Sequence, residues 1–138
     1  MYDKRTIRIV ILFSMTMGIL GCQQQSMSRR KARAQIKSTL SLSSETRIFI
    51  RQIHNGRLTE SFIAGHTEYL KHLQSDLLSE MSKPAADEVA DALTVAQKQL
   101  LALRDVFPNS TIGESEFRAD ESRLDDIDSN LNNILPRP

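Results

Sequence analysis

After Cys22, hydrophobic residues recur at the three- and four-residue spacing of helices, and no stretch alternates over the length of a strand. This spacing predicts four amphipathic helices, at about 29–54, 59–82, 84–107 and 115–135. The segments between them carry helix-ending signals such as Asn55-Gly56 and Pro108. We therefore expect an all-α fold, a small up-down bundle of three to four helices in which short connections make successive helices antiparallel.

The first two helices differ in how clearly their buried side is marked. In the first, the apolar positions are concentrated in the second half: Leu42, Phe49, Ile50 and Ile53. We expect residues 29–38 to form a frayed polar extension, and the hydroxyl-rich run STLSLSS that follows to be a weak point. In the second, Thr59 is a fair N-cap, and one long stripe is expected to be buried: Phe62, Ile63, His66, Tyr69, Leu70, Leu73, Leu77 and Met81.

The third helix has the most regular seam, spaced alternately by four and three residues: Val89, Leu93, Ala96, Leu100, Leu103 and Phe107. The last helix carries a narrower apolar side: Phe117, Leu124, Ile127, Leu131 and Ile134. Its other side is rich in Asp and Asn. Two arrangements therefore stay open for it, packing on the basic first helix or packing on another chain.

The N-terminal segment has the organisation of a secretory signal peptide. Lys4, Arg5 and Arg8 precede the uncharged run Ile9–Leu20, and small residues follow it. A helix of that length extends about 18 Å, whereas the hydrocarbon core of a bilayer is about 30 Å thick. The run is too short to span a membrane comfortably, so we interpret it as a leader that is removed.

The end of this leader, Ile19-Leu20-Gly21-Cys22, resembles the lipobox of bacterial lipoproteins. The resemblance covers only the first 22 residues, and Ile19 and Leu20 are not the commonest residues at their places in that motif. It implies cleavage before Cys22 and a diacylglycerol on the Cys22 thiol, so that residues 1–21 are a signal peptide. Residues 22–28 would then be the lipidated cysteine with a short tether, and 29–138 the helical domain.

Cysteine usage and the residue after Cys22 agree with this interpretation. Cys22 is the only cysteine of the chain, so the domain can form neither a disulfide framework nor a thiolate metal site. In Gram-negative lipoproteins an aspartate after the cysteine resembles an inner-membrane retention signal. Gln23 stands there instead, which favours the outer membrane, facing the periplasm.

Charge is distributed unevenly along the chain. From Ser28 to Arg57 there are eight basic residues and one acid, whereas from Leu58 onward there are seven bases and fifteen acids. One interpretation is that a basic first helix packs beside acidic later helices. The other is that Arg29, Arg30, Lys31 and Arg33 lie on anionic lipid headgroups next to the anchor, each contributing about 1 kcal/mol. An exported, anchored chain does not meet nucleic acid, so we expect no nucleic-acid partner.

The strongest metal-ligand pattern is a column on the second helix, in which Glu68, His72 and Asp76 recur at intervals of four residues. These donors could share a divalent ion, or they could form a solvated face with intrahelical pairs such as one to Lys71. Three ligands from one helix rarely converge on one ion, and no Glu-x-x-His motif occurs. We predict no metal site and no cofactor beyond the covalent lipid.

Two histidines stand apart from this column. His66 falls on the apolar stripe, where a boundary residue with one hydrogen-bonded nitrogen is expected and a haem or metal ligand is the alternative. His54 closes the first helix, where a histidine interacts favourably with the helix dipole. Ser61 and Gly65 place two small side chains four residues apart, which would let another helix approach closely.

Catalytic motifs are missing from the sequence: it contains no Gly-x-Ser-x-Gly, no His-Glu-x-x-His and no phosphate-binding glycine loop. We therefore expect no enzyme, but a lipid-anchored cell-envelope protein with a structural or protein-interaction role. Its partner would be an envelope protein, or a second copy of the chain held through the third or fourth helix. The alternative is a ligand- or metal-binding helical-bundle sensor in the periplasm that uses the column or His66.

Overall fold

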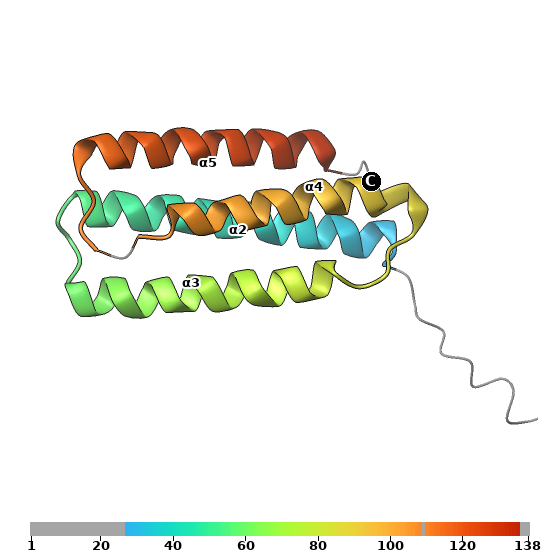
Figure 1. Cartoon of the computed structure of the whole chain (residues 1–138), viewed down its shortest axis with the longest axis horizontal. Helices are drawn as coiled ribbons and strands as arrows, with labels where there is room; N and C mark the ends of the chain where they lie inside the picture. Colours follow the sequence, from blue (N-terminus) through green and yellow to red (C-terminus); the bar gives the residue numbers. More distant parts are fainter. Residues whose placement is uncertain (1–26, 109, 136–138) are drawn as a thin grey trace, which may run out of the picture.

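The predicted helices are present and pack side by side as one bundle. The structure, a computed structural model, describes residues 27–108 and 110–135. Within these residues lie α2 (Arg29–His54), α3 (Glu60–Met81), α4 (Asp87–Leu103), the short 3-10 helix η1 (Arg104–Val106) and α5 (Glu114–Ile134). Figure 1 shows α3 and α5 on either side of the α2 and α4 pair. The all-α bundle is therefore confirmed, while the predicted leader and Cys22 lie outside the described residues.

Helices α2 and α4 form the central pair: each packs against the other and against both α3 and α5. A helix with three neighbours must bury a wide arc of its surface. Nine residues of α2 are buried accordingly, and four of them are small, Ala32, Thr39, Ser43 and Thr46. Small side chains let the neighbouring helices approach α2 closely.

The first half of α2 is neither frayed nor broken, contrary to our expectation. Ala32 and Ile36 are completely buried, and the helix continues through the hydroxyl-rich run. Thr39 Oγ1 donates to the carbonyl of Gln35 at 3.0 Å, and Thr46 Oγ1 donates to the carbonyl of Leu42 at 2.8 Å. Because these hydroxyls find acceptors within their own helix, they can be buried without an unpaired polar atom.

The buried side of α3 is rotated relative to the predicted stripe. Its buried residues are Ile63, Thr67, Leu70, Gln74 and Met81. The Thr67 hydroxyl donates to the carbonyl of Pro108 at 2.6 Å, and the Gln74 amide donates to the carbonyl of Leu100. Two polar residues thus occupy core positions, while Phe62 and Tyr69, predicted to be buried, are about half exposed.

The connections follow the predicted signals. Asn55 ends α2, Gly56 adopts the left-handed conformation with φ 66°, and the Thr59 hydroxyl accepts from the backbone N–H of Phe62 at the start of α3. These features confirm both predicted helix ends.

At the end of the bundle opposite the α2–α3 connection, Met27 forms a short parallel bridge with the segment before α4. Met27 N–H donates to the carbonyl of Pro84 at 2.7 Å, and Ala86 N–H donates to the carbonyl of Met27 at 3.3 Å. This pairing holds Ala85 and Ala86 in extended conformation, so α4 begins at Asp87 and not at 84. Met27 itself is buried in the core.

The last two helices bury the seams that the sequence predicts. All six seam positions of the third predicted helix are buried, although α4 ends at Leu103 and Phe107 follows the 3-10 turn. In α5, Leu124, Ile127 and Leu131 are buried against the rest of this chain, and α5 contacts both α2 and α4. No helix of the described part is long and apolar enough to cross a membrane.

We predict that Leu100→Ala will lower the free energy of unfolding by about 3 kcal/mol, because it leaves a cavity at a completely buried position. The adjacent Leu101 is 54% exposed, so Leu101→Ala, with the same chemical change, should alter stability by less than about 0.5 kcal/mol. Urea unfolding followed by circular dichroism measures both. Equal losses for the two variants would contradict the register of α4.

Candidate functional site

A cluster of aromatic rings lies where α2 and α3 meet. The ring of His66 is 4.4 Å from that of Phe49, 5.6 Å from Phe62 and 5.4 Å from Tyr69, between ring centroids. Phe62 and His66 are nearly parallel, with 11° between their planes. Phe49 is buried, whereas Phe62 and Tyr69 are exposed. His66 is therefore the centre of a partly exposed aromatic surface.

Two adjoining hollows run along the same junction, which we call the α2/α3 groove. One, of about 200 Å³, is lined by Glu45, Ile48, Phe49, Gln52, Phe62 and His66. The other, of about 290 Å³, is lined by Ser38, Ser41, Leu42, Glu45, Leu73 and Leu77. Glu45 belongs to both linings, and its carboxylate is 3.4 Å from His66 Nε2. The floor of the groove is thus mainly apolar, with one carboxylate at its middle.

Large exposed hydrophobic side chains gather at this groove. Four occur among the described residues, and three of them are at the groove or beside it: Ile48 at 57% exposed, Phe62 at 51% and Tyr69 at 47%. The fourth, Leu101, is on α4. Contiguous exposed apolar side chains of this kind mark interaction sites in soluble domains. This surface was not predicted from the sequence, because the helical spacing of Phe62 and Tyr69 assigns both to the core.

The four predicted surface-contact bases lie in the first turns of α2. Arg29 pairs with Glu88 at 2.9 Å across to α4, so part of the cluster serves packing inside the bundle. Arg30 and Lys31 are exposed and Arg33 is half-buried, and these three form no ion pair within the described residues. Two of the four positions, Arg30 and Lys31, are therefore exposed bases without an ion pair among the described residues.

The solvent side of α2 continues this positive charge along the helix. Seven exposed residues, spaced alternately by four and three, make up what we call the α2 outer stripe: Arg30, Ala34, Lys37, Ser41, Ser44, Ile48 and Arg51. Residues at this spacing share one face of a helix. The stripe contains three bases and no acid, and its apolar member Ile48 also lines the groove.

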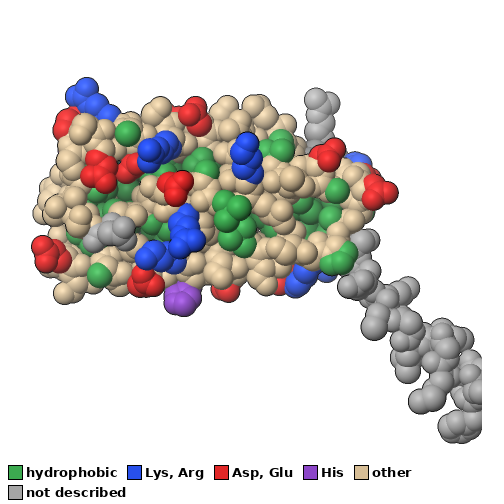
Figure 2. Space-filling model, in the orientation of Figure 1, with side chains coloured by type: hydrophobic (Ala, Val, Ile, Leu, Met, Phe, Trp, Pro, Cys, Tyr) green, Lys and Arg blue, Asp and Glu red, His purple; other side chains and the backbone are tan. Residues whose placement is uncertain are grey.

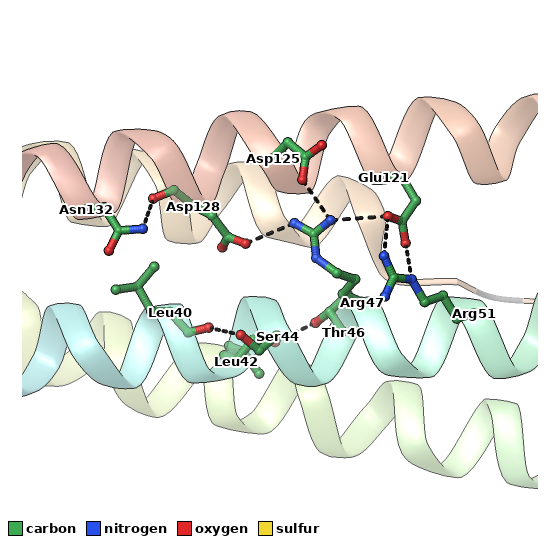
Figure 3. A network of polar contacts seen from close by, with 10 residues as sticks. All are labelled: Leu40, Leu42, Ser44, Thr46, Arg47, Arg51, Glu121, Asp125, Asp128 and Asn132. Atoms are coloured by element: carbon green, nitrogen blue, oxygen red, sulfur yellow. Dashed lines mark hydrogen bonds and ion pairs between the residues drawn. The ribbon is translucent and has the colours of Figure 1, made fainter.

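Arg47 and Arg51 of α2, the second also a member of the outer stripe, pair with acids of α5. Arg47 reaches from α2 to Glu121, Asp125 and Asp128, with N–O distances of 3.2, 2.8 and 2.9 Å (Figure 3). Arg51 donates two hydrogen bonds to Glu121, both at 2.8 Å. For these residues the intramolecular interpretation of the charge asymmetry is confirmed. Hydrogen bonding from Arg51 lowers the pKa of Glu121, and burial lowers the pKa of Arg47 less than its aspartate partners raise it.

The side chains of the Glu68, His72 and Asp76 column do not group together. Glu68 pairs with Lys71 at 2.7 Å, which lowers the pKa of Glu68 through a hydrogen bond, and His72 and Asp76 are exposed. In residues 27–108 and 110–135, no three side chains of His, Cys, Asp or Glu are grouped closely enough to hold an ion. Glu68 takes the intrahelical pair that we considered as the alternative.

His54 has more partners than the helix dipole alone. Its ring stacks on Phe117 at 4.2 Å with 6° between the planes, and its Nε2 is 3.1 Å from Glu114. The histidine therefore joins the end of α2 to the first turns of α5. The sequence could not reveal this pairing, because 60 or so residues separate the two segments along the chain.

A further hollow of about 310 Å³ lies between α4 and α5 and is lined by Gln99, Ala102, Asp105, Arg123, Asp126 and Ile127. Its lining mixes charges of both signs with few apolar side chains. One turn before Arg123, Asp120 is 6% exposed, and its nearest ionic partner, Arg123, is 3.4 Å away. Burial raises the pKa of Asp120.

Comparison of the chain with protein-family models, with curated proteins and with solved structures finds no match. No relative's activity is therefore carried over to this chain. The candidate site rests on this molecule alone: an apolar groove with exposed aromatic side chains, beside a helix face that bears only positive charge.

Replacing Arg47 by methionine should lower the free energy of unfolding by about 2 kcal/mol, because it removes hydrogen bonds to three carboxylates at once. The Arg47 side chain is 16% exposed, whereas that of Arg118, paired with Glu114, is 77% exposed. Arg118→Met is the matched control and should change stability by less than about 0.5 kcal/mol. Urea unfolding at low and high salt gives both values. If the two variants behave alike, Arg47 does not hold α5 to α2.

Relative to the unmodified protein, the Asp120→Asn variant should gain more stability at neutral pH than at acid pH. A raised pKa in the folded state contributes stability below the pKa of the unfolded chain, and this stability is lost as pH rises through the folded pKa. Asparagine has no charge to desolvate, so the variant avoids that loss. Urea unfolding at neutral pH and near about pH 3 tests this. A stability difference from the unmodified protein that stays constant with pH would contradict it.

Proposed function

We propose that this protein is a lipid-anchored cell-envelope protein with a structural or protein-interaction role. The observation that carries the proposal is the order of features at the N-terminus: basic residues, an uncharged run, Ile19-Leu20-Gly21-Cys22, and then a bundle in which Met27, the first residue that the structure describes, is buried. A leader that ends so close to a folded domain suits an anchor. Two or three fatty chains hold a protein at a bilayer durably, whereas one does not.

The short tether limits where the bundle can be. Four residues separate Cys22 from Met27, and the five Cα–Cα steps between them reach at most about 18 Å when the chain is fully extended. Met27 is bonded to the turn before α4, so the reach begins at a fixed point of the bundle. An acylated Cys22 would therefore keep the start of α2 next to the membrane surface, and Gln23 favours the outer membrane on its periplasmic side.

The bundle offers surfaces for association, and we assign no catalytic residue to it. The α2/α3 groove and the acidic outer side of α5 are the two faces with a distinct chemistry. An envelope protein or a second copy of this chain is the partner that we propose, and nucleic acid is not. No cofactor enters the proposal beyond the covalent lipid.

A ligand- or metal-binding sensor stays the alternative hypothesis. His66 in the groove, with Glu45 at 3.4 Å, is a histidine-carboxylate pair that lines a hollow. Calorimetric titration with divalent metals and with haem distinguishes the two hypotheses. A saturable heat that His66→Gln abolishes would favour the sensor.

The anchor has a direct test. In bacterial cells labelled with a fatty acid, the protein should incorporate the label, and mass spectrometry should find an acylated residue 22 as the new N-terminus. Cys22→Ser should remove the label and leave an uncleaved chain that keeps Met1. Label that persists in the Cys22→Ser variant, or an unmodified thiol in the native protein, would overturn the proposal.

A further inference from the structure

The groove and the α2 outer stripe lie side by side and differ in chemistry from the opposite side of the molecule. Ile48 belongs to both, and Phe62 lines the same hollow as Ile48. Because α2 and α4 pack against each other, their solvent sides face in opposite directions. On the α4 side, acidic and basic side chains are interspersed with hydrophobic ones (Figure 2). The charged members of the outer stripe are Arg30, Lys37 and Arg51, and of these only Arg51 is paired with an acid, Glu121 of α5.

We propose that the α2/α3 face is a membrane-docking surface, on which the anchored bundle lies along an anionic lipid bilayer. Arg30 and Lys37 would contact headgroups, and Ile48, Phe62 and Tyr69 would enter the boundary between headgroups and acyl chains. The proposal rests on the anchor proposed above and adds an orientation to it. It also extends the predicted contact, which covered only the first turn and a half of α2, along most of the length of that helix.

Charge complementarity is the first argument for this occupant. Each basic side chain near an anionic lipid surface contributes favourably, and the long stems of Lys and Arg can lie along apolar surface while their charges reach headgroups. Arg30 and Lys37 have no ion-pair partner within the described residues. Two acids share this face: Glu45, whose carboxylate is 3.4 Å from His66 Nε2, and the exposed Asp76, seven residues after Tyr69 on α3. The unpaired positive charge is therefore concentrated at Arg30 and Lys37, in the first half of α2, where the face would meet the headgroups.

The exposed hydrophobic residues supply the second argument. Helices that lie in a membrane interface typically carry aromatic and large aliphatic side chains beside or opposite basic ones. Phe62 and Tyr69 are seven residues apart on α3 and thus share one side of that helix. Exposure in water of three such side chains costs free energy, which burial in the interface recovers.

The tether supplies the third argument, because it decides which partner is always within reach. An anchor five residues before Met27 holds the start of α2 at the lipid surface, and Arg30 is in the first turn of that helix. The remaining stripe residues follow along the same axis. A bundle lying on α2 would bring all of them to the bilayer without any further ordering of the chain.

Site-specific fluorescence tests the proposed orientation, because the sequence contains no tryptophan. Phe62→Trp and Tyr69→Trp place a reporter in the proposed face, and Leu101→Trp is the matched control on α4. The lipidated protein is reconstituted in vesicles of equal parts phosphatidylglycerol and phosphatidylcholine with brominated acyl chains. We expect a blue-shifted, strongly quenched emission from residues 62 and 69, and neither effect from residue 101.

Removing charge tests the contribution of the stripe. Lys37→Gln, in the Phe62→Trp background, should lower the ratio of docked to undocked protein about fivefold, and Arg30→Gln by a similar factor. Lys98→Gln, which removes an exposed base from α4, should leave the ratio unchanged. Vesicles of phosphatidylcholine alone should give little quenching at residue 62.

Three outcomes would overturn the inference. Equal quenching at residues 62, 69 and 101 would mean that no face of the bundle is preferred. No quenching at any of the three would mean that the bundle does not contact the lipid. A blue shift at residue 62 that appears only as protein concentration rises, in vesicles without brominated chains, would assign the groove to a second copy of the chain. Flotation with the vesicles separates these failures from failure of the anchor: protein that does not float has lost the anchor itself.

Discussion

The structure depends on one packing constraint: α2 must pack against three helices at once. A helix in that position cannot carry large hydrophobic residues all round, because its neighbours would then be held apart and its remaining face would attract other molecules. The buried hydroxyls Thr39 and Thr46 resolve this by bonding to carbonyls of their own helix. Small side chains, of which Thr39 and Thr46 bond within their own helix, thus let the polar-looking α2 be one of the two central helices of the bundle.

Helices α3 and α5 lie at the sides of the central α2 and α4 pair. They are held to the bundle by different interactions. Helix α3 buries a narrow arc and adds hydrogen bonds from Thr67 and Gln74 to backbone carbonyls of other segments. Helix α5 buries three large aliphatic residues and adds the ion pairs of Arg47 and Arg51. The contact between α2 and α5 is consequently sensitive to salt in a way that the contact with α3 is not.

Much of the fold could be predicted from sequence, because the four-three spacing and the end signals of each helix are local properties. The seam of α4 and the caps around Asn55 and Thr59 follow from neighbouring residues alone. The exposure of Phe62 and Tyr69 could not be predicted, because it depends on how many neighbours α3 has. The same reason applies to Ile36. Few apolar residues surround it in the sequence, and it is buried because α2 packs against three other helices.

The candidate site was predictable in its charge and not in its shape. The excess of bases in the first helix is visible along the chain, and the structure divides it between bases that hold α5 and bases that face solvent. That division depends on rotation about the helix axis, which places Arg47 toward Glu121 and Lys37 away from it. The groove needs two helices to exist and leaves no signal in either of them.

The bridge between Met27 and the segment from Pro84 to Ala86 has a mechanical consequence. Any tension that reaches the bundle from residue 26 acts first on two backbone hydrogen bonds to another part of the chain, and only then on the first turn of α2. Load is therefore shared between the starts of two helices that pack together. A domain held in this way would resist being unravelled from its end by a force such as the proposed anchor would transmit.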